Sequence, residues 1–218
     1  MSPTLTVILP VLDEGSEIEG ALASLREVFR GEVLVVDGGS SDDTVERALK
    51  TERKVLHAAA GIASQCNFGA GRATGDILFF VGADVRLPPD FHGHILSLFR
   101  SPYVAAGGFR LHIAGQGFFF KLISWGGNWR SRTWQMTFPD QGLFVRRDYY
   151  EKLGGMDSSS RIPFAKFCRA VSACGEFVIL PEPVVSSPRK WLQHGKWRTT
   201  FHHLKVFSQF LCAEGRRP

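Results

Sequence analysis

The sequence predicts an α/β protein in which a doubly wound, mostly parallel sheet is flanked by helices and followed by a C-terminal helix. First, apolar strand-like runs alternate three times with segments of helical spacing within residues 4–81, and such alternation requires crossover connections. Second, the run Ile77–Val81 is short, apolar and rich in large or branched side chains, as expected of a strand buried on both faces. Third, acidic residues follow several of these runs, where open α/β sheets bind ligands.

The elements of residues 1–100 follow from their apolar patterns and their boundary residues. A first strand is expected over Thr4–Leu9 and is ended by Pro10. Ser16, with Glu19 three residues later, has the spacing of a capping box that starts a helix. Ser41 or Asp42 is the expected cap of the next helix. The remaining strands of this half are expected over 32–36, 54–57 and 77–81, and the remaining helices over 61–72 and 90–100.

Residues 101–188 are expected to form strands over 103–113, 141–146 and 177–180 and helices over 118–134, 148–153 and 163–173, with a tail helix over 194–210. Pro181 and Pro183 should end the last strand, and Gly126 with Gly127 predicts a kink or a break in the longest helix. That helix combines six aromatic residues with three cationic ones. This combination indicates either a buried helix with a basic face or an aromatic wall that contacts a sugar ring or a lipid.

The composition is that of an ordinary globular protein, with 218 residues of which 44% are apolar and 22% charged. We expect a single domain over residues 1–218. The amino terminus lacks the basic start and the length of a signal peptide, and no apolar run reaches the roughly 18 residues of a membrane span. Four cysteines (Cys66, Cys168, Cys174 and Cys212) form no close CxxC pair, so we expect reduced core thiols in a cytoplasmic protein.

Positive charge is concentrated in the tail. The net charge of the chain is +5, but residues 189–218 alone carry +6 and the rest of the chain therefore carries −1. The tail's only acid is Glu214, and its cations are Arg189, Lys190, Lys196, Arg198, Lys205, Arg216 and Arg217. A neutral body with a basic tail indicates a tail that meets an anion, namely a phosphate, an acidic lipid surface or a partner. A merely solvated basic helix is the alternative.

The predicted strand ends place acids along one edge of the sheet. Because the carboxyl ends of parallel strands share an edge, the segments Pro10–Glu14, Asp37–Ser40 and Gly82–Asp84 should lie side by side. Any one of these acids, taken alone, is as easily explained as the cap of a turn. Three acids at one edge are harder to explain in that way, so we predict a ligand site there.

Six stretches also form an ordered set of motifs. They are VILPVLDE (Val7–Glu14), VVDGGSSDDT (Val35–Thr44), a Gly/Ala-rich segment with Gln65 and Asn67 (Gly61–Asp76), FFVGADVRLP (Phe79–Pro88), PDQGLFVRRDYYEKLGG (Pro139–Gly155) and a run that begins RKW (Arg189–Thr199). Together they resemble the family 2 glycosyltransferases of GT-A fold. More narrowly, the chain resembles the short bacterial branch of arsenosugar-biosynthesis or selenodomain-associated glycosyltransferases. The resemblance covers most of the chain.

The resemblance implies a glycosyltransferase that moves a sugar from a UDP- or GDP-linked donor to an unknown acceptor. It implies a nucleotide-binding half at about 1–100, an acceptor half at about 101–188 and a basic tail helix at 189–218, which is compatible with peripheral membrane contact. No nucleic acid partner is expected. The donor-binding residues that it implies are Pro10, Glu14, Asp37, Gln65, Asn67 and Asp84.

The resemblance also implies a divalent cation, Mg²⁺ or Mn²⁺, held by Asp84 at the end of a DxD-type motif. Such a cation needs few protein ligands when phosphates supply the others, and it offsets the charge that grows on the leaving phosphate. The acceptor hydroxyl must lose its proton to a base. Asp140 and Asp157 are the candidate catalytic residues for that step.

Several positions depart from the family pattern. Pro163 and Phe164 stand where the family carries an acidic pair whose aspartate is the expected base. Gly82 stands where the branch commonly has histidine, and the donor helix has Ile62 and Ser64 where arginines are frequent. Two interpretations follow: a transferase that uses another base, or a catalytically degenerate protein that binds nucleotide or a partner without turnover. A nucleotidyltransferase would need a phosphate-gripping glycine-rich loop near the first strand, and VLDEGSE lacks one.

Overall fold

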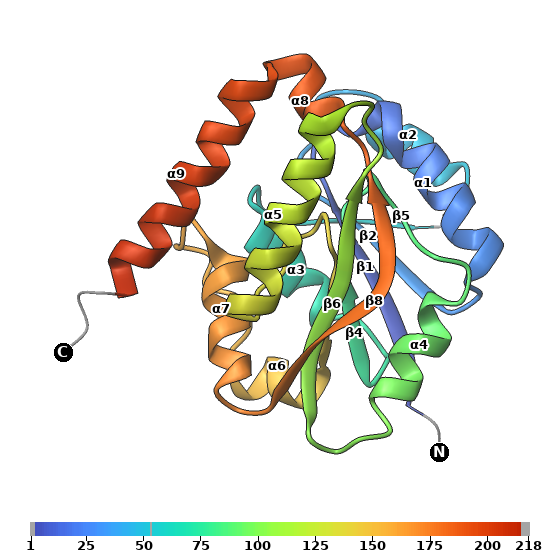
Figure 1. The fold of residues 1–218 in the computed structure, drawn as a ribbon. Coiled ribbons are helices and arrows are strands. Elements are labelled where there is room, and N and C mark those ends of the chain that lie inside the picture. The colour runs from blue at the N-terminus through green and yellow to red at the C-terminus, as the bar shows by residue number, and fades with distance from the viewer. Residues whose placement is uncertain (1–2, 53, 215–218) are drawn as a thin grey trace.

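The computed structural model describes residues 3–52 and 54–214 and shows one curled sheet of eight strands with helices on both faces (Figure 1). The strands are β1 (Leu5–Val11), β2 (Glu32–Asp37), β3 (Val55–His57), β4 (Ile77–Phe80), β5 (Val85–Arg86), β6 (Val104–Ile113), β7 (Leu143–Arg146) and β8 (Glu176–Ser186). Their order in the sheet is β3-β2-β1-β4-β7-β6-β8-β5. β3, β2, β1 and β4 are mutually parallel, and so are β6 and β8, whereas β7 is antiparallel to both its neighbours. The predicted fold class is confirmed.

The helices lie on both sides of this sheet. They are α1 (Gly15–Val28), α2 (Thr44–Leu49), α3 (Ile62–Ala70), α4 (Phe91–Leu98), α5 (Phe118–Trp134), α6 (Arg147–Lys152), α7 (Pro163–Ser172), α8 (Arg189–His194) and α9 (Lys196–Glu214). Within the described part of the chain, none of them is both long enough and apolar enough to cross a bilayer.

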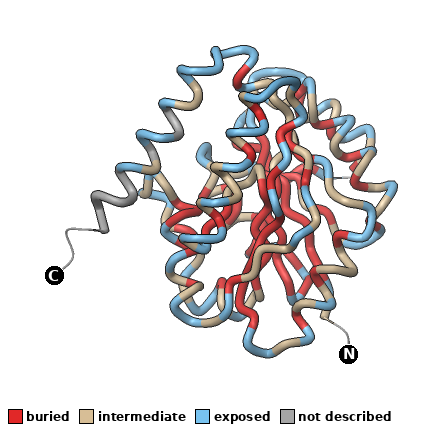
Figure 2. Tube along the Cα trace, in the orientation of Figure 1, coloured by how far each residue is buried: buried red, intermediate tan, exposed pale blue. Residues whose placement is uncertain are grey.

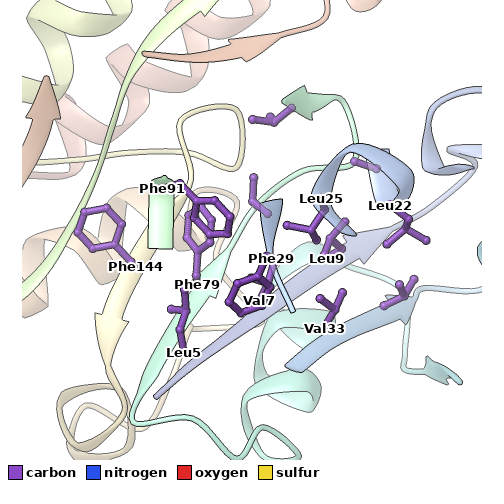
Figure 3. Close-up of a cluster of buried hydrophobic side chains, with 14 of the residues drawn as sticks. Leu5, Val7, Leu9, Leu22, Leu25, Phe29, Val33, Phe79, Phe91 and Phe144 are labelled. Atoms are coloured by element: carbon purple, nitrogen blue, oxygen red, sulfur yellow. The ribbon is translucent and has the colours of Figure 1, made fainter. Parts of the chain in front are cut away.

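The residues of the central strands are mostly buried (Figure 2). Their side chains pack on both faces of the sheet, because neighbouring residues of a strand point in opposite directions. Val7 and Leu9 of β1 pack in a cluster with side chains of α1 and α4, which Figure 3 shows. Ile8, between them, packs in a second cluster with side chains of α3 and α7. This two-sided burial explains why the central strands are nearly unbroken apolar runs.

The prediction that Pro10 ends the first strand is wrong. The carbonyl of Ile8 accepts a hydrogen bond from the N–H of Val81 on the β4 side of β1. Residues two apart in a strand face the same side, so the nitrogen of Pro10 also faces β4, beyond the last residue pair of Ile8 with Phe80. The missing N–H therefore removes no ladder bond, and β1 continues to Val11.

The C-terminal half differs from the sequence prediction at several further points. β8 continues through Pro181 and Pro183, because a bulge next to them absorbs the irregular register with β6. α5 crosses Gly126 and Gly127 without a break, and a kink there stays a prediction. The tail forms two helices instead of one, since Gly195 takes a φ of 87°, which is easy only for glycine. Neither β5 nor α8 was predicted.

The predicted N-cap positions of α1 and α2 are also wrong. Glu14, and not Ser16, occupies the N-cap position of α1, while the hydroxyl of Ser16 accepts a hydrogen bond from Arg189 at 2.6 Å. Asp43, and not Ser41 or Asp42, occupies that of α2. The carboxylate of Asp42 still accepts a hydrogen bond from the N–H of Thr44, the first residue of α2, at 3.0 Å. Its other oxygen accepts one from the N–H of Gly15 at 3.0 Å, and it thereby ties the second loop to the start of α1.

Two of the cysteines behave as predicted. Cys66 and Cys168 are buried, and burial raises the pKa of Cys168 to about 11. Cys174 is exposed, so its assignment to the core is wrong. The side chain of Cys212, and residues Arg216 and Arg217 of the basic tail, lie outside what the structure describes.

Candidate functional site

The loops that follow β1 and β2 interlock at the edge where the acids were predicted to meet. Val11 pairs with Asp37 at the ends of the two strands. Beyond them, the carboxylate of Asp13 accepts a hydrogen bond from the N–H of Ser41 at 2.8 Å, and the N–H of Asp13 donates to the hydroxyl of Ser40 at 3.0 Å. The two loops therefore lie together at this edge of the sheet. We call them, with the loop after β4 that carries Asp84, the rim.

The carboxylate of Asp37 is almost fully buried at the end of β2 and fixes the loop after it. It accepts hydrogen bonds from the hydroxyl of Ser40 at 2.5 Å and from the N–H groups of Gly39 at 2.9 Å and Ser40 at 3.1 Å. Nδ1 of His57 lies 3.5 Å away. Burial alone would raise the pKa of Asp37, but these hydrogen bonds hold it below its ordinary value. Asp37 is thus an anion at neutral pH, and its contact with a donor stays a prediction.

Asp37→Asn should lower the free energy of unfolding at pH 7 by about 1.5–3 kcal/mol, the range for hydrogen bonds to a charged group. Folding lowers the pKa of this carboxyl, so its stabilising effect is present above the unfolded pKa and is lost as the pH falls through the folded pKa. The difference between wild type and variant should therefore shrink below about pH 4. Urea unfolding at pH 7 and pH 3 measures it, and a difference that grows at pH 3 would contradict the assigned cause.

Gln65 and Asn67, both predicted to contact the donor, lie on α3 but bond to different parts of the molecule. The amide of Gln65 is buried and donates to the carbonyls of Val11 at 2.7 Å and Val36 at 2.9 Å, so it ties the ends of β1 and β2 together. The amide of Asn67 donates to the carbonyl of Met156 at 2.7 Å and accepts from its N–H at 2.8 Å. Both side chains therefore position backbone, and a donor contact for either one stays a prediction.

Two further acids of the rim, Glu14 and Asp84, pair with the first two residues of α8. The guanidinium of Arg189 forms an ion pair with Glu14. Nζ of Lys190 lies 3.2 Å from the carboxylate of Asp84. The N–H of Ser187 donates to the carbonyl of Asp84 at 2.9 Å, which fixes the segment that leads into α8. The start of the basic tail thus meets the acids of the predicted donor site.

The charges of this group shift one another's pKa values. Burial raises the pKa of Glu14, and the neighbouring Arg189 offsets only part of that rise. Partial burial alone would lower the pKa of Lys190, but Asp84, Glu14 and Asp140 together raise it. Lys190 therefore remains a cation at neutral pH and interacts with three carboxyl groups. We call Glu14, Asp84, Asp140, Arg189 and Lys190 the charged cluster.

Asp140 enters the charged cluster from the loop before β7. The N–H of Gly82 donates to the carbonyl of Pro139 at 3.0 Å, which joins the loop after β4 to the loop that carries Asp140. Asp140 interacts electrostatically with Lys190 and with the largely buried guanidinium of Arg130. The structure therefore brings this candidate base to the side of the sheet where Asp84 lies.

Asp157 has a different set of contacts. Its carboxylate forms an ion pair with Lys166 of α7 and accepts hydrogen bonds from the N–H and the hydroxyl of Ser159 at 2.9 and 2.6 Å. The hydrogen bond from Lys166, with those from Ser159, holds the pKa of Asp157 well below its usual range, and such a carboxylate is a weak base. Phe164 stands at one of the two positions where the family has an acidic residue. It lies on α7, and its side chain is buried in the core.

The sequence did not predict the pairing of Arg189 with Glu14 and of Lys190 with Asp84. The concentration of cations in the tail was visible, but these two residues were assigned to a tail helix that binds an anion of unknown identity. The only signal that singled them out was the RKW run at 189–191, whose distance from the strand-end acids in sequence says nothing of their proximity in space.

The residues of the rim fit a divalent cation when the ligand supplies most of the coordination. Within the described ranges there is no group of three or more His, Cys, Asp or Glu side chains that could hold a metal by themselves. Asp84 offers one carboxylate at the strand end. Mg²⁺ on nucleotides commonly uses one or two carboxylates together with phosphate oxygens, so Asp84 with a bound diphosphate matches that requirement.

Comparison with known proteins gives the same fold. The sequence profile of the family described as "Glycosyl transferase family 2" matches residues 6–154. A PGL/p-HBAD biosynthesis glycosyltransferase of Mycobacterium bovis (strain BCG / Pasteur 1173P2) is 33% identical over 95 residues, which are 39% of this chain and 37% of that relative.

Two solved structures share the architecture. The mannosyltransferase PcManGT from Pyrobaculum calidifontis, in complex with GDP-Man and Mn²⁺, aligns with a TM-score of 0.68 at 22% identity over 85% of this chain and 57% of that one. TarS from S. aureus, in complex with UDP-GlcNAc, aligns with a TM-score of 0.68 at 17% identity over 84% of this chain and 58% of that one. These likenesses confirm the GT-A fold. This chain spans less than two thirds of the length of each of the three proteins.

Proposed function

Because this chain belongs to glycosyl transferase family 2, we propose that it transfers a sugar from a UDP- or GDP-linked donor to the hydroxyl group of an acceptor. The observation that carries the proposal is the charged cluster, in which acids at the ends of β1 and β4 meet Arg189 and Lys190 from the tail. The GDP-Man with Mn²⁺ and the UDP-GlcNAc that are bound to the two structural neighbours support the same donor class.

The donor would lie along the rim. We assign the base and ribose to the segment Pro10–Glu14 and to Asp37, because carboxylates accept hydrogen bonds from ring N–H and ribose hydroxyl groups. The diphosphate would lie at Arg189 and Lys190, which supply positive charge where the phosphates need it. Asp84 would hold the divalent cation, which when bound offsets the charge on the leaving diphosphate.

In the transfer, the acceptor oxygen forms a bond to the anomeric carbon while the bond from that carbon to the diphosphate breaks. The electron pair leaves with the diphosphate, and the acceptor proton passes to a carboxylate. We assign that role to Asp140, because the hydrogen bond from Gly82 to Pro139 places the loop that carries Asp140 next to the loop that carries Asp84. Asp157 is the weaker candidate, since its pKa is held low by Lys166 and Ser159.

Two finer assignments rest on the sequence alone. The short bacterial arsenosugar-biosynthesis branch and a cytoplasmic location both stay predictions. The degenerate alternative was suggested by Pro163 and Phe164, at the positions of the acidic pair. Release of nucleotide from a panel of UDP- and GDP-sugars distinguishes an active transferase from a protein that only binds the donor.

UDP or GDP with Mn²⁺ should raise the Tm of the protein by about 5–10 °C at a nucleotide concentration of about 100 Kd, where binding adds about 2.7 kcal/mol of stability. The reason is that a ligand which binds only the folded state stabilises it by mass action. Differential scanning fluorimetry measures the shift, with uridine and guanosine as controls that lack the phosphates. The same Tm with every nucleotide would contradict the donor site.

A further inference from the structure

The described residues expose large apolar side chains mostly on α5, α8 and α9. Eight of their eleven exposed large hydrophobic residues lie on these three helices, which are on one side of the molecule (Figure 1). The eight are Phe118, Leu122, Trp125, Trp129, Leu192, Trp197, Phe201 and Leu204. A concentration of this kind on a folded surface marks an interaction site.

On α5 the exposed apolar residues form a single stripe. Phe118, Leu122, Trp125 and Trp129 are separated by four, three and four residues, which places them on one face of a helix. A neighbouring face of the helix is held by hydrogen bonds to the edge of β6, including two between Asn128 and the backbone of Leu111 at 2.7 and 2.9 Å. The stripe is therefore exposed on a fixed helix, and two of its residues, Leu122 and Trp129, also border the space between α5 and α9. We call it the α5 stripe.

Between α5 and α9 lies a pocket of about 260 Å³. α9 contacts α5 through Trp197, whose ring lies 5.9 Å from that of Phe119, and through Phe207, whose ring lies 5.1 Å from that of Trp134. The pocket is lined mainly by apolar groups, among them Leu111, Ile123, Gly126, Trp191 and Leu204. A pocket of this size and lining suits part of an apolar chain.

Charged groups also line this pocket. Arg130 and Asp140 contribute to its wall. Asp140 interacts electrostatically with Lys190, whose ammonium lies 3.2 Å from Asp84. The pocket therefore adjoins the charged cluster, and a molecule with an apolar chain in the pocket would present its polar end to Asp140.

We propose that the pocket binds the apolar chain of a membrane lipid whose head carries the acceptor hydroxyl, and that the α5 stripe rests on the bilayer that supplies it. The proposal rests on the proposed function and names its acceptor class. The lipid hydroxyl gives its proton to Asp140 and its oxygen bonds to the anomeric carbon as the diphosphate leaves. The product is a lipid with one more sugar.

The charge of these helices fits an anionic bilayer. α5 contains no acidic residue, and its Lys121 and Arg132 flank the stripe and are exposed. Lys196, Arg198 and Lys205 of α9 are exposed as well. Aromatic side chains with Lys and Arg beside them are typical of helices that lie in a membrane interface, where the rings enter the headgroup layer and the cations meet anionic lipids.

The first test fills the pocket. Gly126 lines it, and a Cβ at that position would meet no atom within 4 Å. Gly126→Leu should therefore occupy the pocket, whereas Gly126→Ala is the matched control, and both residues are better helix formers than glycine. Octyl glucoside below its critical micelle concentration, titrated calorimetrically, serves as a probe with one chain and a hydroxyl-bearing head.

We expect wild type and Gly126→Ala to bind octyl glucoside alike and Gly126→Leu to bind it at least about tenfold more weakly. The Tm shift with UDP or GDP should be the same in all three proteins. Equal binding of the probe by Gly126→Leu, or no binding by wild type, would overturn the pocket assignment. Loss of the nucleotide shift in wild type would instead contradict the proposed function.

The second test addresses the bilayer. Wild type should sediment with phosphatidylglycerol vesicles in low salt, less in high salt, and less with phosphatidylcholine vesicles. The double variant Phe118→Gln, Trp125→Gln should bind at least about tenfold more weakly, while Tyr103→Gln, which changes an exposed aromatic residue away from these helices, should bind as wild type.

Vesicle binding that the double variant leaves unchanged, or that wild type lacks, would overturn the membrane contact. Light scattering provides the remaining control. A wild-type dimer that the double variant converts to monomers would show that a second copy of the chain, and not a bilayer, covers the α5 stripe.

Discussion

Asp140→Asn should lower the rate of sugar transfer by about 10²–10⁴-fold and leave donor binding unchanged, because the amide has the shape of the carboxylate but cannot take the acceptor's proton. Asp140 belongs to the charged cluster, but no nucleotide contact is assigned to its side chain, because the diphosphate is assigned to the cations Arg189 and Lys190. Single-turnover release of UDP or GDP gives the rate, and calorimetric titration of the nucleotide gives the affinity. Activity in wild type is first established with the donor panel and an octyl glucoside acceptor.

Asp157→Asn is the matched control, since it makes the same chemical change at a carboxylate whose pKa is held low by Lys166 and Ser159. Its transfer rate should stay close to that of wild type. A wild-type rate in Asp140→Asn together with a large loss in Asp157→Asn would reverse the two assignments. Loss of nucleotide binding in Asp140→Asn would show that Asp140 acts by positioning its neighbours Arg130 and Lys190.

The parallel half of the fold was predictable because each of its strands can be recognised from its own stretch of sequence. The runs that become β1, β2 and β4 are apolar and short, and the crossover rule then fixes their common direction. The other half depends on partners distant in sequence. β5 is only Val85–Arg86 and exists because it pairs with Val185 and Ser186 of β8. The same pairing and the bulge at Pro181 allow β8 to continue beyond Leu180, where the two prolines were predicted to end it.

The site divides in the same way. Acids that follow parallel strands share an edge by geometry, so the joint position of Asp37 and Asp84 could be predicted. The hydrogen-bond partners of Gln65 and Asn67 could not, because residues two apart on a helix point in different directions and only the packed structure shows what each one meets. The pairing of Lys190 with Asp84 depends on where the chain returns after β8, which no local pattern encodes.

Lys190→Met should lower kcat/KM for transfer by about 10²–10³-fold, the range for removal of one group that stabilises charge developing in the transition state. Nζ of Lys190 lies 3.2 Å from Asp84 and also interacts with Glu14 and Asp140. Without it, a bound diphosphate would face three carboxyl groups with Arg189 as the remaining cation of the charged cluster. The affinity for UDP or GDP should fall more than that for uridine or guanosine, which have no phosphates.

Lys166→Met is the matched control, because it removes a lysine of similar exposure from another Lys–Asp pair, that with Asp157. It should leave kcat/KM and nucleotide affinity close to those of wild type. The two variants distinguish between two roles of Lys190. In the first, Lys190 binds the diphosphate of the donor; in the second, it only pairs with Asp84 when no donor is bound. In the second case the ammonium competes with the donor and its cation, so Lys190→Met would bind UDP or GDP with Mn²⁺ more tightly than wild type does. That result would contradict the role assigned to Lys190 in transfer.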